Sequence, residues 1–229
     1  MPGILQGIII ALIGYLWGSI PAGYWMGKAL RGRDFDIRNY GSHKTGATNV
    51  LRTLGRWPAA IVFVFDISKG VGPALLATLV PVFYLGGWGP TIAALLALLG
   101  HCFPVFIGFK GGRGVSTGAG AILVLSPLTF LAAAISTFST IAITRYVSLG
   151  SIMGALASIV FSLIFFFAGQ VANVHFPQLV FLVLGPALVI LFHYDNIGRL
   201  LSGKERKFGQ KVKTEEETPP STNSFTSKA

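Results

Sequence analysis

Long apolar runs alternate with short polar segments along almost the whole chain. The runs cover residues 4–27, 59–84, 88–107, 114–126, 128–144, 147–170 and 177–194. A helix needs about 20 apolar residues to cross about 30 Å of hydrocarbon, and most of these runs approach or exceed that length. Their apolar residues form continuous blocks rather than a single stripe, which is typical of membrane spans. The pattern predicts an all-α polytopic integral membrane protein with seven transmembrane helices.

The fourth run is the exception in length. Residues 114–126 would cover only about 20 Å at 1.5 Å per residue. The stretch from Val115 to Thr144 has no charged residue, but Ser126-Pro127 divides it, and a proline ends or kinks a helix near the preceding residue. The fourth span is therefore predicted to be short or broken, either as two short spans or as one interrupted helix.

Lysine and arginine occur in alternate loops. They are Lys28, Arg31, Arg33, Arg38, Lys44, Arg52 and Arg56 after the first run, Lys110 and Arg113 after the third, Arg145 after the fifth, and Arg199, Lys204, Arg206, Lys207, Lys211 and Lys213 after the seventh. The loops at 85–90, 126–127 and 169–178 contain neither residue type. Cytoplasmic loops carry the excess of positive charge. Seven spans with the N-terminus outside place every basic loop and the C-terminus in the cytoplasm.

Composition agrees with a membrane protein. The chain of 229 residues is 52% hydrophobic and 11% charged, against about 25% charged in soluble domains. The net charge of +10 does not indicate nucleic-acid binding, because the cations sit in short loops between spans. We expect a membrane domain at residues 1–208 and a disordered cytoplasmic tail at 209–229, which is rich in Glu, Thr, Ser and Pro. The single cysteine, Cys102, is expected to be a small buried residue.

The first cytoplasmic loop, residues 41–52, has the composition of an anion site. Ser42, Thr48 and Asn49 can donate hydrogen bonds, and Arg52 can hold a phosphate with two parallel bonds. The glycines in this loop permit close approach of the backbone. An ordinary polar loop has the same composition, so both interpretations stay open on the residues alone.

A second glycine-rich loop precedes the fourth run. It contains Lys110, Gly111, Gly112, Arg113 and Gly114. Free N–H groups at a helix start, together with the helix dipole, favour a bound anion. The loop lacks the Gly-x-x-x-x-Gly-Lys-Ser/Thr pattern, so ATP or GTP hydrolysis is not indicated. The alternative is a positively charged turn that only orients the spans.

Two ionisable residues lie inside the second run. Asp66 and Lys69 are three residues apart, which places them on one helix face. Charges inside a membrane are rare and usually pair or face an interior. We expect a structural ion pair near the site rather than a direct catalytic role.

Histidine and asparagine close the seventh run. His193 and Asn196 share a helix face at i, i+3, and histidine can exchange protons near neutral pH. His101 is a weaker candidate, and His175 is expected to lie in an external loop without a chemical role. The histidines are dispersed and the cysteine is single, so no metal site is predicted.

Four segments together resemble the acyl-phosphate glycerol-3-phosphate acyltransferases, the PlsY family. They read Gly41-Ser-His-Lys-Thr-Gly-Ala-Thr-Asn-Val-Leu-Arg52; Asp66-x-x-Lys69-Gly70; Gly100-His-x-Phe-Pro104 with Phe109-Lys-Gly-Gly-Arg-Gly-Val-Ser-Thr117; and His193-x-x-Asn196-Ile197-x-Arg199-Leu-Leu with Gly203-x-Glu205. The resemblance covers residues 14 to 207. Departures are His43-Lys44, where the family usually has Gly-Asn, and Arg113, where it usually has Lys, which is not an equivalent donor.

The resemblance implies a bacterial inner-membrane enzyme of phospholipid synthesis. Such an enzyme moves a fatty acyl group from acyl phosphate to the 1-position of sn-glycerol 3-phosphate, giving lysophosphatidic acid and phosphate, without acyl-CoA and without a cofactor. By position, it implies catalytic roles for Ser42, Arg52, His193 and Asn196, substrate or phosphate binding by Thr48, Asn49, Lys110, Gly111, Gly112, Arg113 and Gly114, and supporting roles for Asp66, Lys69, His101 and Glu205.

Two other functions fit parts of the pattern. A transporter of small phosphorylated anions would also have spans, glycine loops and cations, but it would place cations or broken helices near the membrane midplane. Here nearly all cations lie on one side. A structural scaffold would not need the charges at Asp66 and Lys69. One-sided acyl transfer is therefore the favoured hypothesis.

Overall fold

The protein is all-helical, as the sequence predicts. The computed structural model describes residues 2–169 and 174–210, and these contain no strand. The α-helices are α1 (Pro2–Gly18), α2 (Ala22–Arg31), α3 (Ala47–Thr53), α4 (Arg56–Leu79), α5 (Pro81–Tyr84), α6 (Trp88–Cys102), α7 (Val115–Leu125), α8 (Pro127–Thr144), α9 (Val147–Ala168), α10 (Phe176–Leu191) and α11 (Tyr194–Leu201). Nearly all of the predicted disordered tail lies outside the described residues.

Five helical segments in the described part are long and apolar enough to span a membrane. They are Gly3–Arg31, Arg56–Leu79, Pro81–Ile107, Pro127–Thr144 and Val147–Ala168. The pair α10 and α11, bent by 55°, adds a sixth if it is counted as one span. The predicted number of seven is not confirmed, because α7 has only 11 residues and covers about 16 Å at 1.5 Å per residue.

Prolines explain where the apolar runs break into separate helices. Ser126 ends α7 with extended φ, and Pro127 starts α8, so the stretch from 115 to 144 is two helices rather than one kinked helix. Pro21 separates α1 from α2, and Pro81 separates α4 from α5. A proline lacks an N–H donor and favours the first turn of a helix over its interior.

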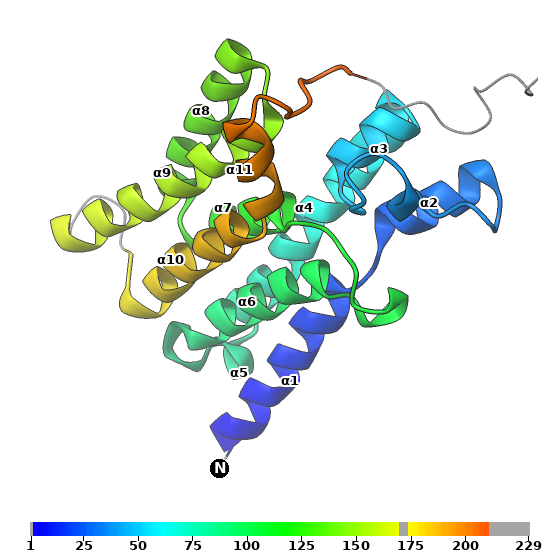
Figure 1. Ribbon diagram of the computed structural model, residues 1–229. Coiled ribbons are helices and arrows are strands. Elements are labelled where there is room, and N and C mark those ends of the chain that lie inside the picture. The colour runs from blue at the N-terminus through cyan, green and yellow to red at the C-terminus, as the bar shows by residue number, and fades with distance from the viewer. Residues whose placement is uncertain (1, 170–173, 211–229) are drawn as a thin grey trace, which may run out of the picture.

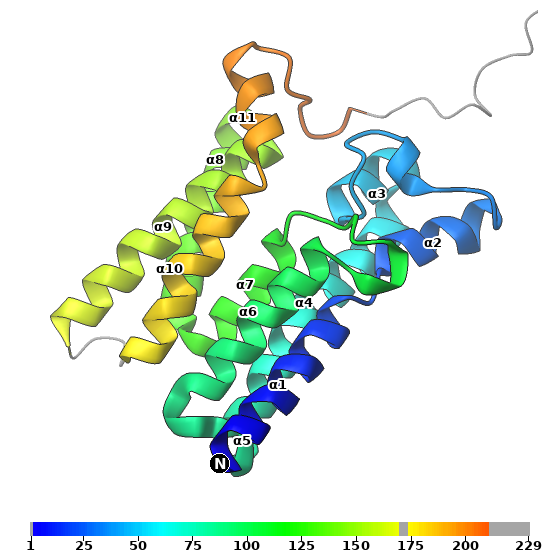
Figure 2. The same cartoon turned by 60° about the horizontal axis from the view of Figure 1, so that its bottom comes forward.

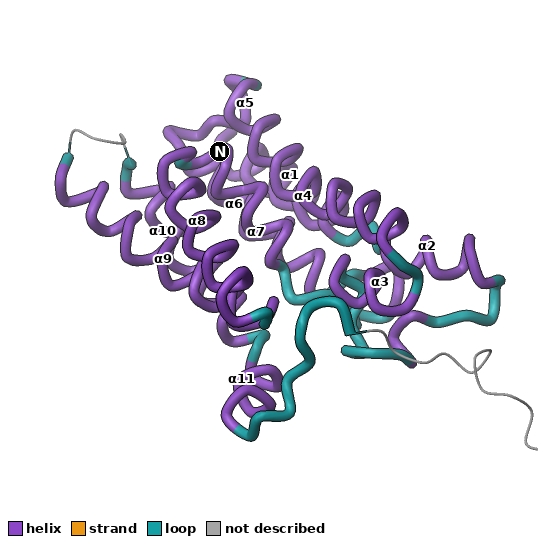
Figure 3. The backbone as a smooth tube through the Cα atoms, turned by 90° about the horizontal axis from the view of Figure 1, so that it is seen from above, coloured by secondary structure: helices purple, strands orange, loops and turns teal. Residues whose placement is uncertain are grey.

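The helices form two groups. α1, α4 and α6 pack together, with α7 along α4, while α8, α9 and α10 form the second group, which contacts the first through α6 and α7 (Figure 1). The basic segments around α2, α3, the loop after α6 and α11 lie at the same end of the bundle (Figure 2). Seen from above, loops gather at this end beside α3 and α11 (Figure 3). The predicted clustering of the basic loops is therefore present in the fold.

Glycines bring α4 and α7 into direct backbone contact. A Cβ at Gly70 would lie 1.9 Å from the carbonyl oxygen of Thr117, and a Cβ at Gly120 would lie 2.2 Å from that of Ile67. Small residues permit such close packing between membrane helices. The Thr117 hydroxyl also donates to the main-chain carbonyl of Asp66 at 3.0 Å. These contacts fix the start of α7 beside the charged segment of α4.

Candidate active site

A cavity of about 480 Å³ opens between the two helix groups, a volume within the usual range for small-molecule sites. Its polar lining includes Ser42, Lys44, Thr48, Asn49, Arg52, Asp66, His101, Arg113, Ser116, Ser148, Ser151, His193, Asn196 and Glu205. Its apolar lining includes Phe63, Ile67, Ile122, Phe130, Ala133, Ala134, Phe138, Ile141, Ala155, Pro186 and Val189. Phe138 is 64% exposed, so this apolar arm reaches the outer surface of the bundle at α8.

Arg52 and Arg113 bring two partly desolvated cations to the polar part of the cavity. Burial lowers the pKa of both guanidinium groups from the ordinary value, and repulsion from neighbouring arginines, Arg199 among them in each case, adds to the effect. The Arg113 Nε is buried without a hydrogen-bond partner among the described residues. The Arg52 guanidinium makes one long bond, 3.5 Å, to the carbonyl of Arg206. Both groups therefore retain donors for an anion.

The loop before α3 is held in shape by one buried amide. The Asn49 side chain donates to the carbonyls of Ile37, Tyr40 and Lys44 at 2.8 to 3.1 Å. Its Oδ1 accepts the N–H of Ser42 at 2.9 Å. Asn49 borders the cavity, but its polar atoms are engaged with the loop, so it organises the loop.

Ser42 and Thr48 keep hydroxyl groups available at the same cavity wall. Both are half-buried and line the cavity. In the described part of the chain, neither hydroxyl takes part in a hydrogen bond that would compete with a ligand. Thr48 lies in the first turn of α3. These two residues can donate to an oxygen placed between them and the arginines.

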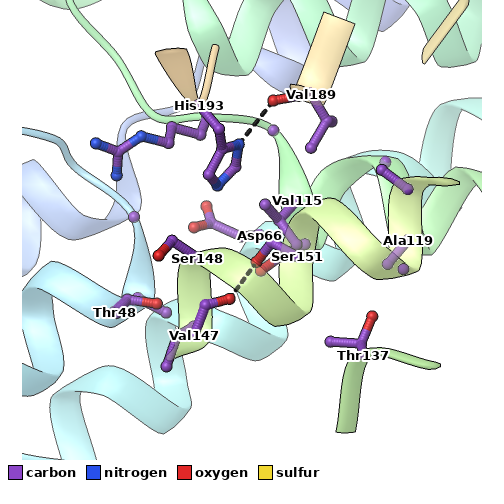
Figure 4. Close-up of a pocket in the computed structure, with 18 of the residues that line it drawn as sticks. Thr48, Asp66, Val115, Ala119, Thr137, Val147, Ser148, Ser151, Val189 and His193 are labelled. Carbon is purple, nitrogen blue, oxygen red and sulfur yellow. Dashed lines mark hydrogen bonds between the residues drawn. The ribbon is translucent and has the colours of Figure 1, made fainter. Parts of the chain in front are cut away.

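His193 presents one ring nitrogen to the cavity. Its Nδ1 lies 2.7 Å from the carbonyl oxygen of Val189, and a carbonyl only accepts, so the neutral ring carries its proton on Nδ1. Nε2 then keeps a lone pair that can accept a proton or a hydrogen bond. The ring stands over Asp66 and Ser148 in the close-up (Figure 4). The side chain is 3% exposed, so its orientation is fixed by packing and by the Val189 contact.

Glu205, which lines the cavity, connects α11 to α9. Its Oε1 accepts from the Ser148 hydroxyl and from the Asn196 amide, each at 2.8 Å, and its Oε2 accepts from the Arg199 Nε at 2.7 Å. Burial alone would raise the pKa of Glu205, but these three hydrogen bonds outweigh burial and hold the pKa below the ordinary value. The carboxylate therefore stays charged and anchors Asn196.

Asn196 has one atom left for another partner. Its Oδ1 is buried and has no hydrogen-bond partner in the described structure, while its amide is engaged with Glu205. His193 and Asn196 both line the cavity, as their i, i+3 spacing predicts. The bond to Glu205 therefore fixes the Asn196 amide at the cavity wall and leaves its Oδ1 without a partner.

Asp66, Lys69 and His101 form a buried polar cluster at one wall of the cavity. Lys69 Nζ lies 2.6 Å from Asp66 Oδ1, which confirms the predicted ion pair. His101 Nδ1 lies 3.6 Å from the same oxygen, too far for a hydrogen bond. Asp66 and His101 line the cavity, whereas Lys69 lies behind them.

The first part of the glycine loop does not form the predicted anion cradle. The N–H groups of Gly111 and Gly112 donate to the carbonyls of Cys102 and His101, both at 3.1 Å, so they are not free for an anion. A Cβ on Gly112 would lie 2.0 Å from His101 Nε2. The glycines thus pack the loop against α6. Lys110 is exposed and does not line the cavity.

The remaining part of this loop does face the cavity. Arg113 and Gly114 line it, and Gly114 adopts φ +82° at the N-cap of α7, a conformation that favours glycine. The first N–H groups of α7 follow directly and have no partners within the helix. His175 lies elsewhere, exposed at the N-cap of α10, and Cys102 is buried as predicted.

Sequence reasoning missed the serines of α9. Ser148 and Ser151 line the cavity from the start of an otherwise apolar helix. Their i, i+3 spacing, continued by Gly154 and Ala155, marks a face of small residues. That pattern could have indicated a helix face turned toward a cavity rather than toward lipid.

Comparison with known proteins identifies the family. Residues 8–203 match the family model described as glycerol-3-phosphate acyltransferase. The chain belongs to this family. A glycerol-3-phosphate acyltransferase from Thermoanaerobacter sp. is 40% identical over 91% of this chain and 98% of its own length. The one from Streptococcus pneumoniae is 38% identical over 86% and 91%.

Two solved structures share the fold of this acyltransferase. Both are crystal structures of PlsY, an integral membrane glycerol 3-phosphate acyltransferase. The glycerol 3-phosphate form has a TM-score of 0.79 and 36% identity, and the lysophosphatidic acid form has 0.75 and 37%. Each match covers 89% of this chain and 96% of the other. The relatives support the acyltransferase hypothesis and give no support to a transporter.

Proposed function

We propose that this protein transfers a fatty acyl group from acyl phosphate to the 1-position of sn-glycerol 3-phosphate, giving lysophosphatidic acid and phosphate. One observation carries the proposal. A single cavity joins two partly desolvated arginines to an apolar arm that reaches the surface of the bundle. Both proposed substrates carry phosphate, and only the donor carries a long apolar chain, so such a cavity matches the pair.

Substrate placement follows from the lining. Phosphate groups bind Arg52 and Arg113, supported by the Ser42 and Thr48 hydroxyls and by the first N–H groups of α7. The acyl chain occupies the apolar arm along α8, and the donor enters sideways from the lipid near Phe138. Holding both reactants in one desolvated cavity lowers the entropic part of the barrier.

The chemistry needs no covalent intermediate, because the mixed anhydride of acyl phosphate is already activated. A hydroxyl oxygen of glycerol 3-phosphate attacks the acyl carbonyl carbon, a C–O ester bond forms, and the bond from that carbon to the phosphate oxygen breaks. The hydroxyl proton passes to the leaving phosphate or to His193 Nε2. Arg52 and Arg113 stabilise the negative charge that develops on carbonyl and phosphate oxygens.

The membrane orientation is part of the proposal. The N-terminus faces outward, and the loops around α3, the glycine loop and α11 face the cytoplasm of a bacterial inner membrane. This orientation is supported by the clustering of lysine and arginine at one end of the bundle. It gives the cavity access to water-soluble glycerol 3-phosphate from the cytoplasm.

A donor comparison tests the reaction. Purified protein in detergent receives labelled glycerol 3-phosphate with either palmitoyl phosphate or palmitoyl-CoA. We expect labelled lysophosphatidic acid only with palmitoyl phosphate. Product formed only with palmitoyl-CoA would refute the donor assignment. In a parallel reaction with palmitoyl phosphate labelled in its acyl group, trapping of a labelled acyl-enzyme would refute direct attack.

A further inference from the structure

Asp66 is the second carboxylate, beside Glu205, in the lining of a cavity that also holds two arginines. The residue lies on α4, is 2% exposed and lines the cavity that holds Arg52 and Arg113. A carboxylate at this position repels a phosphate group and attracts a hydroxyl donor. Its presence needs a reason beyond the ion pair with Lys69, because that pair engages only one of its two oxygens.

The two carboxylates of the cavity differ in whether an oxygen is free to accept a hydrogen bond from a ligand. Glu205 has both oxygens engaged, by Ser148, Asn196 and Arg199. Asp66 accepts from Lys69 through Oδ1, and the described residues supply no hydrogen bond to its Oδ2. Figure 4 shows the Asp66 carboxylate pointing into the space below the His193 ring. Asp66 Oδ2 is thus an uncommitted acceptor that faces the site, on a residue that is otherwise buried.

The position of Asp66 is rigidly determined. Thr117 on α7 donates to its main-chain carbonyl at 3.0 Å, the Gly70 contact fixes α4 against α7, and Lys69 holds Oδ1 at 2.6 Å. A group held by three contacts can orient a ligand at little further entropic cost. The ion pair therefore orients the Asp66 carboxylate: Lys69 binds Oδ1, and Oδ2 is left facing the cavity.

We propose that Asp66 Oδ2 accepts a hydrogen bond from the hydroxyl of the acyl acceptor that is not acylated. This inference rests on the proposed acyl transfer to a phosphorylated polyol. The acceptor then spans the polar part of the cavity, with its phosphate on the arginines and its free hydroxyl on Asp66. The reacting hydroxyl is on the terminal carbon beyond the free hydroxyl, where it lies within reach of His193 Nε2. Asp66 is a substrate-positioning residue and takes no proton.

The test compares two acceptors that differ by one hydroxyl. Glycerol 3-phosphate and 3-hydroxypropyl phosphate share the phosphate and the reacting hydroxyl, but the second lacks the 2-hydroxyl. We expect the wild-type protein to prefer glycerol 3-phosphate by tenfold or more in kcat/KM, which corresponds to about 1.4 kcal/mol for a hydrogen bond to a charged group.

The variant for this test removes both charges. Asp66→Leu/Lys69→Met avoids leaving a buried lysine unpaired, because replacing a buried ion pair by apolar residues of similar size is often tolerated. We expect the acceptor preference to fall close to one in this double variant, because only glycerol 3-phosphate loses a contact. Asp66→Asn is a smaller change, and we expect its acceptor preference to lie between those of the wild type and the double variant. This variant keeps the inference testable if the double variant does not fold.

Thr117→Val is the matched control, since it removes a contact to Asp66 but leaves the carboxylate in place. Its acceptor preference should equal that of the wild type. An unchanged preference in the Asp66 variants, or a wild type that does not distinguish the two acceptors, would overturn the inference while leaving acyl transfer intact. A wild type that acylates neither acceptor from palmitoyl phosphate would instead refute the proposed function.

Discussion

His193 has the orientation required of a proton acceptor. Nδ1 is held by the Val189 carbonyl, so Nε2 faces the cavity with a free lone pair in the neutral ring. We predict that His193→Ala lowers kcat for acyl transfer by roughly 10²- to 10⁴-fold, the usual contribution of a positioned acid or base. The measurement is turnover with saturating palmitoyl phosphate and glycerol 3-phosphate.

His175→Ala is the matched control for this experiment. His175 is exposed at the N-cap of α10, away from the cavity, and we expect its substitution to leave kcat unchanged. Equal turnover of the two variants would remove His193 from the reaction. Proton transfer would then fall to the leaving phosphate alone.

Arg113 and Lys110 are neighbours in the sequence but not in function. Arg113 lines the cavity with an unpartnered Nε, whereas Lys110 is exposed outside it. We predict that Arg113→Ala lowers kcat/KM for glycerol 3-phosphate by about 10- to 100-fold, the loss expected for hydrogen bonds to a charged group. Lys110→Ala should change it less than twofold. A larger effect at Lys110 would show that the loop rearranges when substrate binds.

Residue types identified the candidates but not their orientation. Ser42, Arg52, His193 and Asn196 all line one cavity, which their composition and motif spacing predicted. Asn49 and the 111–112 glycines have the same chemical capacity, yet their hydrogen bonds are used within the fold. Which donor stays free depends on backbone conformation and packing, and neither is encoded in spacing alone.

At the scale of elements, prolines made several boundaries predictable. The break at Pro127 follows from the missing N–H donor, and the structure places a helix end there. The 55° bend between α10 and α11 has no such marker at residues 192–193. It arises where His193 leaves the helix, and it lets α11 carry Asn196 toward the cavity. Hydropathy marks the end of the seventh apolar run at residue 194, but it does not give the direction in which the following polar helix leaves.

The α9–α11 contact through Glu205 should make the site sensitive to acid. The folded pKa of Glu205 is lower than its ordinary value of 4.5, so its pairing stabilises the fold above about pH 4.5 and is lost as pH falls through the folded pKa. We predict that Glu205→Gln lowers Tm at pH 7 by roughly 2–8 °C, the effect of about 1–2 kcal/mol of lost charged hydrogen bonds.

Thermal unfolding of both proteins across pH 7 to 3 measures this effect. The Tm difference between wild type and Glu205→Gln should narrow steadily below pH 4.5, because the wild-type carboxylate becomes protonated and resembles the amide. A constant difference over that range would mean that charge on Glu205 contributes nothing. Asp34→Asn, at an exposed position, is the control and should show no such narrowing.

At the scale of the whole molecule, the cavity is a product of how two helix groups meet. The α4–α7 contact is close because of Gly70 and Gly120, while α8 packs along α9 on the other side. The space between them becomes the apolar arm. Hydropathy showed that these helices are apolar, but lipid-facing and cavity-facing positions share that property. The arm could therefore not be predicted from the sequence.

Membrane orientation is also a property of the whole fold. It can be measured by cysteine labelling, because removing the single cysteine gives a background without a thiol. In a Cys102→Ala background, Ser202→Cys labels the exposed end of α11 and His175→Cys labels the opposite end of the bundle. With a membrane-impermeant maleimide, we expect His175→Cys to react in spheroplasts and Ser202→Cys only in inverted vesicles. The reverse pattern would place Arg52 and Arg113 outside, away from cytoplasmic glycerol 3-phosphate, and would contradict the proposed orientation. Reaction of both positions from one side would mean that α10 does not cross the membrane.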